Sequence, residues 1–321
     1  MSPATTWGST GSRPSRSSRW RGRARAPSPC ILPRNGAGAG RLPRRGSATR
    51  GNRLPAPPPH PAPAATASPR PPPLAPPERA RGLRDGLAFY AMLAILGGGF
   101  LGWGLVAYPL SFLLPPRLGR PLGRRVITAG FGGLLRLMER LGLVELDLAG
   151  IEPLRGARGL VVAPNHLAML DVMLVVSRLP DTVCIMKAGL ERNPALGGGR
   201  LAGYIPNRDP RHVIAGATEA LRAGANLLVF PEGTRSPDGS LGPFHPGFAL
   251  IARRAGAPVQ TVLIESNSRY LGKGWPIWRQ PAFPLRYRAR LGERVAVGGP
   301  AAGFAEALRE RHAAALGTTT R

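Results

Sequence analysis

Residues 159–176 read GLVVAPNHLAMLDVMLVV, and they contain the change from a strand to a helix around which the rest of the fold is predicted. An apolar run of strand length comes first, and apolar residues at helical spacing follow it. His166 and Asp171 lie five positions apart at this junction. On one continuous helix their side chains would point about 140° apart. If His166 lies in the turn before the helix and Asp171 in its first turn, the imidazole and the carboxylate can meet.

A paired imidazole and carboxylate is typical of general-base chemistry. The carboxylate holds one ring nitrogen protonated and leaves the other free to accept a proton. An unperturbed imidazole titrates near about 6.5, so it serves as a base at neutral pH. No Gly-x-Ser-x-Gly nucleophile accompanies the pair, so we expect the base to activate a hydroxyl of a substrate. For the pair taken alone, a helix-capping Asp beside a surface His is the alternative.

A second junction, NLLVFPEGTRS at residues 226–236, ends another apolar run in a tight turn. Pro231 lacks a backbone donor, and Gly233 permits backbone angles closed to other residues. The planar guanidinium of Arg235 suits phosphate oxygens. We expect Glu232 to receive polar groups of a substrate or to hold the Arg in place. Arg208 is a further candidate cation, and a surface ion pair is the alternative for each Arg.

The chain around these junctions alternates apolar runs with helical patterns. Strands are predicted at residues 159–163, 182–187, 226–230, 259–264 and 283–291, and helices at 167–178, 211–223, 248–255 and 303–315. This alternation predicts an α/β fold for residues 144–321, with a mixed central sheet flanked by helices. Both junctions fall at strand ends, where open α/β sheets place their ligand crevices.

Residues 86–143 are predicted to be a membrane-associated two-helix segment. Residues 86–114 carry no charge and exceed the roughly 20 residues that cross a bilayer as a helix. We expect this segment to bend at Gly97–Gly99, dip into the membrane and return. Residues 125–143 then form an interfacial helix. Two ordinary core helices are the alternative.

Residues 1–85 hold 16 Arg and 18 Pro and are predicted to be a disordered tail. Its only aromatic residues suited to stacking are Trp7 and Trp20, so we expect no nucleic-acid partner. A solvated tail, or upstream sequence translated from a wrongly chosen start, is the favoured interpretation. The chain carries a net charge of +27, and the Arg excess outside the tail favours anionic headgroups. Its two cysteines, Cys30 and Cys184, match no metal-binding spacing, and we expect no metal or redox cofactor.

The order and spacing of the two junctions and of the block Gly203–Arg208 resemble the glycerolipid acyltransferase superfamily, most closely the 1-acyl-sn-glycerol-3-phosphate (lysophosphatidic acid) acyltransferases. The resemblance implies transfer of a fatty acyl chain from acyl-CoA or acyl carrier protein to a lysophospholipid hydroxyl. The expected acceptor is 1-acylglycerol-3-phosphate, and the product is phosphatidic acid. The family's N-terminal helices sit in the membrane, which implies membrane attachment, and a bacterial inner membrane is expected. The catalytic domain is expected on the cytoplasmic side because thioester donors are made there.

The resemblance also implies roles for individual residues. His166 is expected to be the base, and Asp171 its partner. The residues expected to bind the acceptor are Asn165, Arg208, Glu232, Gly233, Thr234 and Arg235. The sequence does not identify the donors to the developing oxyanion, and the backbone amides near His166, at the start of the predicted helix, are the candidates.

Three departures from the family pattern leave the acceptor open. Pro246 stands where the family usually has Lys, the strand after Pro258 lacks its second Pro, and the third block reads Tyr204-Ile205-Pro206-Asn207-Arg208. Glu265, Ser266, Asn267 and Arg269 are candidates to line a different headgroup pocket, and an ordinary polar loop is the favoured alternative. One rival is therefore an acyltransferase of the same fold with another lipid acceptor. A more remote rival is a non-enzymatic protein that binds anionic membranes.

Overall fold

The computed structural model describes residues 72–76, 82–190, 193–236 and 240–317. All of these belong to the second of two compact units of the chain, Pro59–Arg321. Most of the predicted disordered tail therefore lies outside the described residues. Residues 72–76 of that tail are described, and three of their backbone carbonyls accept hydrogen bonds from Asn267, Arg286 and Arg288. This part of the tail therefore lies against Asn267, Arg286 and Arg288.

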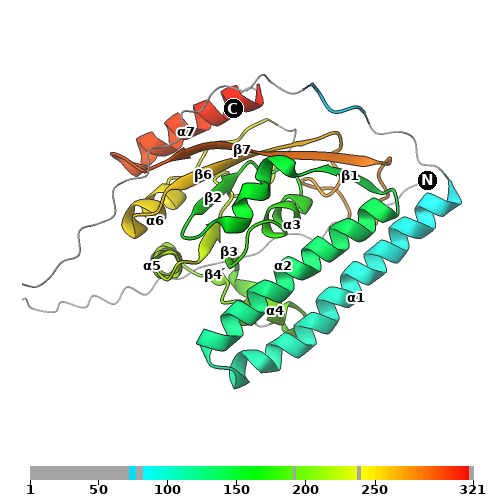
Figure 1. Cartoon of the computed structure of the whole chain (residues 1–321), viewed down its shortest axis with the longest axis horizontal. Coiled ribbons are helices and arrows are strands. Elements are labelled where there is room, and N and C mark those ends of the chain that lie inside the picture. The colour runs from blue at the N-terminus through cyan, green and yellow to red at the C-terminus, as the bar shows by residue number, and fades with distance from the viewer. Residues whose placement is uncertain (1–71, 77–81, 191–192, 237–239, 318–321) are drawn as a thin grey trace, which may run out of the picture. The chain divides into compact units, whose positions relative to one another are not determined.

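A mixed β-sheet forms the centre of this unit and confirms the predicted fold class (Figure 1). In the described residues it has seven strands in the order β1-β7-β6-β2-β5-β3-β4. Every neighbouring pair is parallel except β6 with β7. The strands are β1 Val144–Asp147, β2 Val161–Pro164, β3 Thr182–Lys187, β4 Ile205–Asn207, β5 Asn226–Leu228, β6 Val259–Ser266 and β7 Leu285–Val295. The predictions miss β1 and β4, which are short edge strands without the continuous apolar run of a buried strand.

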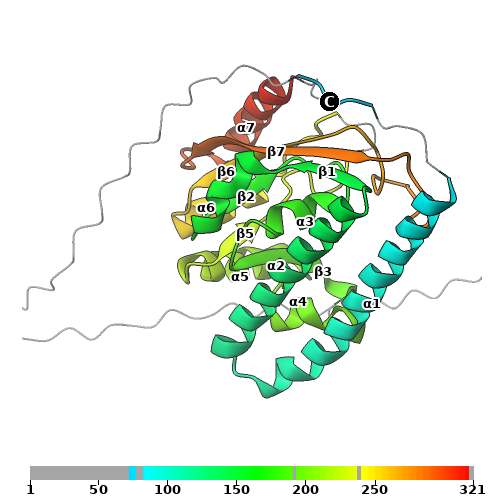
Figure 2. The same cartoon turned by 45° about the vertical axis from the view of Figure 1, so that its right-hand side comes forward.

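Helices cover both faces of the sheet, as Figures 1 and 2 show. The helices are α1 Leu83–Leu113, α2 Pro116–Arg140, α3 Leu170–Val176, α4 Gly197–Leu201, α5 Pro210–Arg222, α6 Gly247–Ala255 and α7 Ala301–Leu316. Successive side chains of a strand point to opposite faces. Accordingly, Val162 belongs to the apolar cluster formed with α1, α2 and α3, and Val161 to the cluster formed with α5, α6 and α7.

The apolar N-terminal segment forms one continuous helix, so the predicted bend at Gly97–Gly99 is wrong. The chain reverses at Leu114 and Pro115 instead, and returns as α2. A residue before proline is biased toward extended backbone, and Leu114 has ψ 136°. The three glycines lower helix propensity by about 1 kcal/mol each but remove no backbone hydrogen bond. The predicted second helix, residues 125–143, is the later part of α2.

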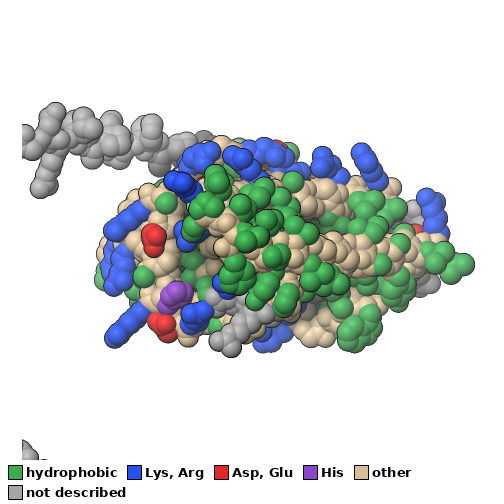
Figure 3. Space-filling model, turned by 90° about the horizontal axis from the view of Figure 1, so that it is seen from below, with side chains coloured by type: hydrophobic (Ala, Val, Ile, Leu, Met, Phe, Trp, Pro, Cys, Tyr) green, Lys and Arg blue, Asp and Glu red, His purple; other side chains and the backbone are tan. Residues whose placement is uncertain are grey.

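Most of α1 faces outward. Among the described helices it is the one that is long and apolar enough to cross a membrane, and only 17% of its most apolar stretch is buried. Figure 3 shows hydrophobic side chains gathered over this side of the molecule, with Lys and Arg side chains at the margin. Exposed apolar side chains of α1 include Leu87, Ile95, Leu101, Leu105, Val106 and Leu113. A surface of this kind marks contact with a membrane or a partner, which disfavours the alternative of an ordinary core helix.

The buried His312 of α7 predicts a pH-dependent stability. Neither of its ring nitrogens has a partner among the described residues, and its ring packs edge-on against Phe244. Burial, and secondarily the guanidinium of Arg290, lowers the pKa of His312 from 6.5 to about 4. The unfolded chain binds this proton as the pH falls below about 6.5, whereas the folded chain binds it only near pH 4. The contribution of His312 to stability is therefore complete above about pH 6.5, and roughly 3 kcal/mol is lost by pH 4.

Urea unfolding of the wild-type chain and of His312→Phe, in one detergent between about pH 4 and pH 7, measures this effect. Other titrating groups are common to both chains and cancel in the difference. The wild type should lose roughly 3 kcal/mol more than the variant on acidification. An equal loss of unfolding free energy in both chains would contradict the assignment of this pH dependence to His312.

Candidate active site

The turn between β2 and α3 brings His166 and Asp171 together. Because α3 begins at Leu170, His166 precedes the helix and Asp171 lies in its first turn, as predicted. The Nδ1 atom of His166 is 3.0 Å from Oδ2 of Asp171. The imidazole stacks on Phe230 with ring centroids 3.8 Å apart, which fixes the plane of the ring. Nε2 has no hydrogen bond to any described residue, and the side chain is 15% exposed, so this nitrogen is open to a substrate.

The carboxylate of Asp171 is fully buried and accepts three hydrogen bonds on one oxygen. Besides His166, its Oδ2 accepts from the N–H groups of Leu167 at 2.6 Å and Ala168 at 2.7 Å. Burial raises the pKa of Asp171, and the hydrogen bonds from His166 and Ala168 oppose that rise. Three donors on one oxygen favour the ionised form. The carboxylate therefore assigns the proton of His166 to Nδ1 and leaves Nε2 as the basic nitrogen.

The backbone of His166 is held by the second junction. Oε1 of Glu232 accepts from the His166 N–H at 2.8 Å, and its Oε2 accepts from the Gly242 N–H at 2.9 Å. The N–H of Ser236 donates to the His166 carbonyl at 2.8 Å. Glu232 is only 4% exposed, and burial raises its pKa. The structure thus gives Glu232 neither of its predicted contacts, since both oxygens bind backbone N–H groups and hold the base.

Gly233 and Thr234 lie at the exposed surface of the same turn. Gly233 has φ 67°, and a Cβ atom there would lie 3.0 Å from Cδ2 of His245. Glycine is therefore required both by the backbone conformation and by the close approach of His245. Thr234 has no hydrogen bond to any other described residue, which leaves its hydroxyl accessible at this surface.

Arg235 joins this turn to the start of α3. Its Nη1 donates to the carbonyls of Leu271 at 2.7 Å and Gly272 at 3.2 Å. The Leu271 carbonyl also accepts from the N–H of Met169 at 3.2 Å. Within the described part of the chain Nε and Nη2 of Arg235 have no acceptor, so they remain for an anion.

Asn165 has a different place from the predicted one. Its amide oxygen accepts from the Ile264 N–H at 2.8 Å, and its amide nitrogen donates to the Ile264 carbonyl at 2.9 Å. The side chain is only 3% exposed. Asn165 therefore joins the end of β2 to β6 and is not open to a substrate.

The predicted oxyanion donors are already engaged. The amides of Leu167 and Ala168 donate to Asp171, and the amide of Met169 donates to Leu271. The alternative headgroup cluster is likewise occupied in part, because Asn267 bonds to the backbone of Pro284 and Arg286. These side chains and amides shape the loops, and other groups must face the reacting atoms.

Two cations end the neighbouring strands β3 and β4. In the parallel register Lys187 lies opposite Asn207, next to Arg208. The sequence-based predictions do not include Lys187 as a site residue. Its position could have indicated one, because it is one of only two lysines in the chain and stands at the end of an apolar run. Three strand spacings separate β4 from β2, or about 14 Å. The structure therefore places Arg208 at the same edge as His166 but does not bring it into contact with the base.

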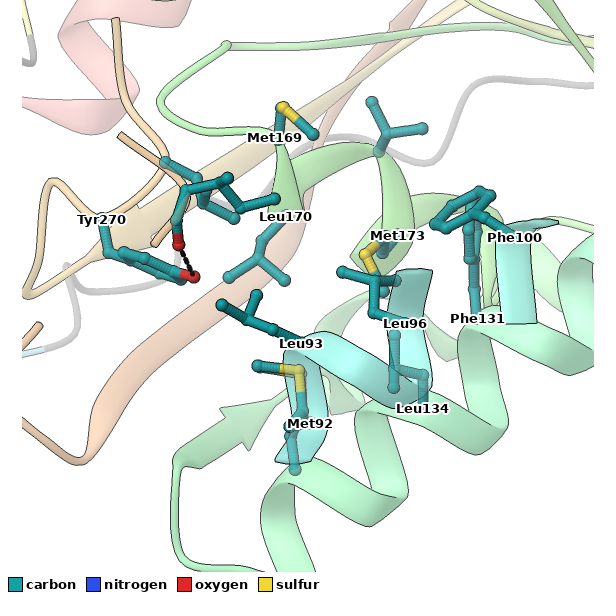
Figure 4. A pocket seen from close by; sticks show the side chains of 14 residues that line it. Met92, Leu93, Leu96, Phe100, Phe131, Leu134, Met169, Leu170, Met173 and Tyr270 are labelled. Carbon is teal, nitrogen blue, oxygen red and sulfur yellow. Dashed lines mark hydrogen bonds between the residues drawn. The ribbon is translucent and has the colours of Figure 1, made fainter. Parts of the chain in front are cut away.

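An apolar cavity of about 220 Å³ begins beside the turn between β2 and α3 (Figure 4). Met169 and Leu170, next to Asp171, form one wall, and Leu271, whose carbonyl binds Arg235, forms another. Side chains of α1 and α2 point in from the opposite side, including Leu93, Leu96, Phe131 and Leu134 (Figure 4). A second apolar groove of about 320 Å³ shares four of the lining residues and continues between α1 and α2. A long hydrocarbon chain suits this path.

Comparisons with known proteins agree with this geometry. A family model described as Acyltransferase matches residues 145–265. The chloroplastic 1-acyl-sn-glycerol-3-phosphate acyltransferase BAT2 of Brassica napus is 32% identical over 137 residues, which are 40% of each chain. The lyso-ornithine lipid O-acyltransferase of Pseudomonas aeruginosa is 32% identical over 176 residues, which are 53% of this chain and 65% of that protein. The chain thus spans about two fifths of the Brassica relative.

The fold is also similar to a solved structure. The 1-acyl-sn-glycerophosphate acyltransferase PlsC from Thermotoga maritima superposes with a TM-score of 0.56 at 24% identity. The similarity covers 74% of this chain and 96% of that chain. It extends beyond the matched domain, so the N-terminal helices and the sheet form part of one shared architecture.

Proposed function

The chain belongs to the acyltransferase family through residues 145–265, and on that premise we propose that it transfers a fatty acyl group from a thioester to the hydroxyl of a lysophospholipid. The observation that carries the proposal is the open Nε2 of His166 in the turn whose next residues, Met169 and Leu170, line an apolar cavity. The favoured acceptor is 1-acylglycerol-3-phosphate, which gives phosphatidic acid. Similar proteins named 1-acyl-sn-glycerol-3-phosphate acyltransferase support this choice of acceptor.

The reaction begins with proton transfer to His166. Nε2 takes the proton of the acceptor hydroxyl while its oxygen attacks the thioester carbonyl carbon. The carbonyl oxygen becomes an oxyanion, the carbon–sulfur bond then breaks, and the leaving thiolate takes the proton from Nε2. Asp171 stabilises the imidazolium that exists between these two transfers. Because nearby amides are engaged, we assign the oxyanion to Nε and Nη2 of Arg235.

Other groups seat the acceptor. The exposed turn at Gly233 and Thr234 and the cation Lys187 face the carboxyl edge of the sheet, where a phosphate would be held beside the base. The acyl chain extends into the apolar cavity between α1 and α2. The outward face of α1 lies in the membrane, so a lipid acceptor enters sideways from the bilayer. The cytoplasmic face is proposed because thioester donors are made there.

A different lipid acceptor is the second candidate. The similarity to a lyso-ornithine lipid O-acyltransferase extends over more of this chain than the match to the Brassica enzyme. The departures at Pro246 and in the block Tyr204–Arg208 also fall outside the usual pattern. Such an enzyme would use His166 and Asp171 in the same way and would differ from a 1-acylglycerol-3-phosphate acyltransferase only in the residues that bind the headgroup of the acceptor.

A mass-spectrometric screen of the purified full chain in detergent tests the proposal. Acyl-CoA and acyl carrier protein serve as donors, and the acceptors are 1-acylglycerol-3-phosphate, lysophosphatidylglycerol, lyso-ornithine lipid and a non-phosphorylated alcohol. We expect phosphatidic acid to form fastest. Faster acylation of lyso-ornithine lipid would favour the second candidate, and no acylated product from any pair would refute acyl transfer.

A further inference from the structure

One oxygen of the Asp171 carboxylate is buried and lacks a donor. Oδ2 accepts from His166 and from the N–H groups of Leu167 and Ala168. Oδ1 is buried as well, and it has no hydrogen bond to any described residue. A buried charged oxygen is costly without a donor, because it has lost the water that would otherwise solvate it. The ionised form of Asp171, which sets the tautomer of His166, therefore calls for a donor at Oδ1.

The hydroxyl of Tyr287 in β7 is a buried donor that lacks an acceptor. The side chain is only 1% exposed, and its hydroxyl has no hydrogen bond to any described residue. Ser266 lies opposite Tyr287 in the register of β6 and β7. The Ser266 hydroxyl is already engaged, because it donates to the Ser268 carbonyl at 3.1 Å and accepts from the Ser268 N–H at 3.2 Å. Since the hydroxyl of a buried tyrosine usually has a partner, we looked for its acceptor elsewhere in the same interior.

The sheet brings Tyr287 level with the catalytic turn. Asn165, at the end of β2, binds both backbone groups of Ile264, and Tyr287 pairs two residues further along β6. Tyr287 belongs to the same apolar cluster as Ile264 and Leu170, so it lies on the face of the sheet that α3 covers. Asp171 follows Leu170 in the first turn of α3 and is itself buried. The hydroxyl and the carboxylate therefore share one interior.

The charge of Asp171 acts on the hydroxyl across this interior. Burial, and next the carboxylate of Asp171, raises the pKa of Tyr287, so the hydroxyl keeps its proton and remains a donor. The other titratable groups that act on this pair are His166 and Glu232 beside Asp171, and Tyr270 beside Tyr287. His166 donates to Oδ2, and Tyr270 donates to a backbone carbonyl. Within this group of described residues, the hydroxyl of Tyr287 is thus the donor left for Oδ1.

We propose that Tyr287 is a positioning residue for acyl transfer, whose hydroxyl supports Oδ1 of Asp171 through one buried water. The inference rests on the proposed function and adds a residue to its machinery. The water accepts from the Tyr287 hydroxyl and donates to Oδ1, and buried waters commonly join two such groups. Donation to Oδ1 stabilises the ionised carboxylate. It thereby lowers the proton affinity of the His166–Asp171 pair and keeps the base unprotonated at neutral pH.

Tyr287→Phe tests this role, because it removes the hydroxyl and keeps the ring. Loss of the donor should raise the proton affinity of the His166–Asp171 pair. The acid limb of the pH profile of kcat/KM, measured on the full chain in detergent, should therefore move to higher pH by about 0.5–1 pH unit. On the plateau above this limb kcat/KM should fall by about threefold to tenfold, because the carboxylate that orients the ring is less firmly held.

A second measurement reads the same pair without turnover. In the full chain with isotope-labelled histidine, the imidazole signal that disappears in His166→Ala belongs to His166, and its shift with pH gives the midpoint of titration by nuclear magnetic resonance. Tyr287→Phe should raise this midpoint by the same amount as the kinetic limb. Incorporation of 3-fluorotyrosine, whose hydroxyl is a stronger donor, should lower the midpoint, and this result decides the matter if Tyr287→Phe does not fold.

Tyr270→Phe is the matched control. Tyr270 is as buried as Tyr287 and belongs to the same apolar cluster, but its hydroxyl donates to the carbonyl of Ile277 at 3.3 Å (Figure 4). Its removal should leave both midpoints within about 0.2 pH unit of wild type. Unmoved midpoints in Tyr287→Phe, or equal shifts in the two variants, overturn the proposal.

The two measurements distinguish this inference from the proposed function. Acyl transfer by the wild type with an unmoved midpoint in Tyr287→Phe contradicts the role of Tyr287 and leaves acyl transfer standing. A raised imidazole midpoint in that variant, without turnover of any acceptor by the wild type, contradicts the proposed function and leaves the contact between Tyr287 and Asp171 standing.

Discussion

Alanine in place of His166 should leave the protein folded and attached to membranes while acyl transfer falls by about 10²–10⁴-fold. The ring is 15% exposed and makes one side-chain hydrogen bond, to Asp171. The backbone contacts of residue 166 with Glu232 and Ser236 do not involve the ring and survive the change. The expected loss is therefore one of catalysis, measured as kcat/KM with the donor and acceptor that the screen identifies.

Two controls separate loss of the base from loss of the fold. Thermal unfolding and vesicle binding should match the wild type, because the apolar face of α1 and the sheet are untouched. Added imidazole should restore part of the activity, since it can enter the space left by the ring and accept the proton. Wild-type turnover in the variant would rule out His166 as the base. Loss of vesicle binding in parallel with activity would point to the rival, non-enzymatic function.

The elements that could be predicted from sequence are those encoded by local pattern. Apolar runs identify β3 and β6, and the change of period after Leu167 places His166 before a helix and Asp171 within it. Their meeting depends on five consecutive positions and a single turn. Local geometry is enough to predict it.

The roles of Glu232 and Asn165 were beyond prediction because their partners are backbone atoms far along the chain. Glu232 binds the amide of a residue 66 positions away, and Asn165 binds one 99 positions away. When a carboxylate accepts hydrogen bonds from backbone N–H groups, its partner can be almost any residue type, so the sequence does not indicate which residue it binds. Chemical logic then favours a substrate contact, and only the packing of β2 between β5 and β6 reveals the alternative.

The error at Gly97–Gly99 has a related cause. Glycine lowers helix propensity locally, but the chain reverses where proline makes continuation of the helix unfavourable, at Leu114 and Pro115. Contact with α4 further stabilises α1, since Gly104 and Gly197 approach so closely that a Cβ atom on Gly197 would lie 2.5 Å from the Gly104 carbonyl oxygen. A glycine in this helix can therefore allow close packing instead of bending the helix. The spacing of residues in the sequence does not distinguish these two roles.

The charge of Asp171, and not merely its hydrogen-bonding capacity, should matter to the rate. Asp171→Asn keeps one oxygen for the amides of Leu167 and Ala168 but removes the negative charge opposite the imidazolium. Alternatively, the amide NH2 can turn toward Nδ1, which favours the tautomer in which Nε2 carries the proton and leaves the N–H groups of Leu167 and Ala168 without an acceptor, because all three bonds end on the same oxygen. For a buried carboxylate that orients a catalytic imidazole, the same change costs about 10⁴ in kcat in a well-studied hydrolase, so a loss of about 10³–10⁴ is expected here.

Glu232→Gln is the matched control, because it neutralises a second buried carboxylate that touches the backbone of His166 and not its ring. The glutamine oxygen still accepts one of the two N–H groups, and the other, from His166 or Gly242, loses its acceptor at a cost of about 1–3 kcal/mol in stability. We therefore expect this variant to unfold at lower temperature yet keep turnover within about tenfold of wild type, while Asp171→Asn shows the larger loss of kcat. Steady-state kinetics and thermal unfolding of both variants measure the contrast. Equal kinetic losses would mean that the two carboxylates act alike as structural supports, since only a charge placed against the ring stabilises the imidazolium during proton transfer.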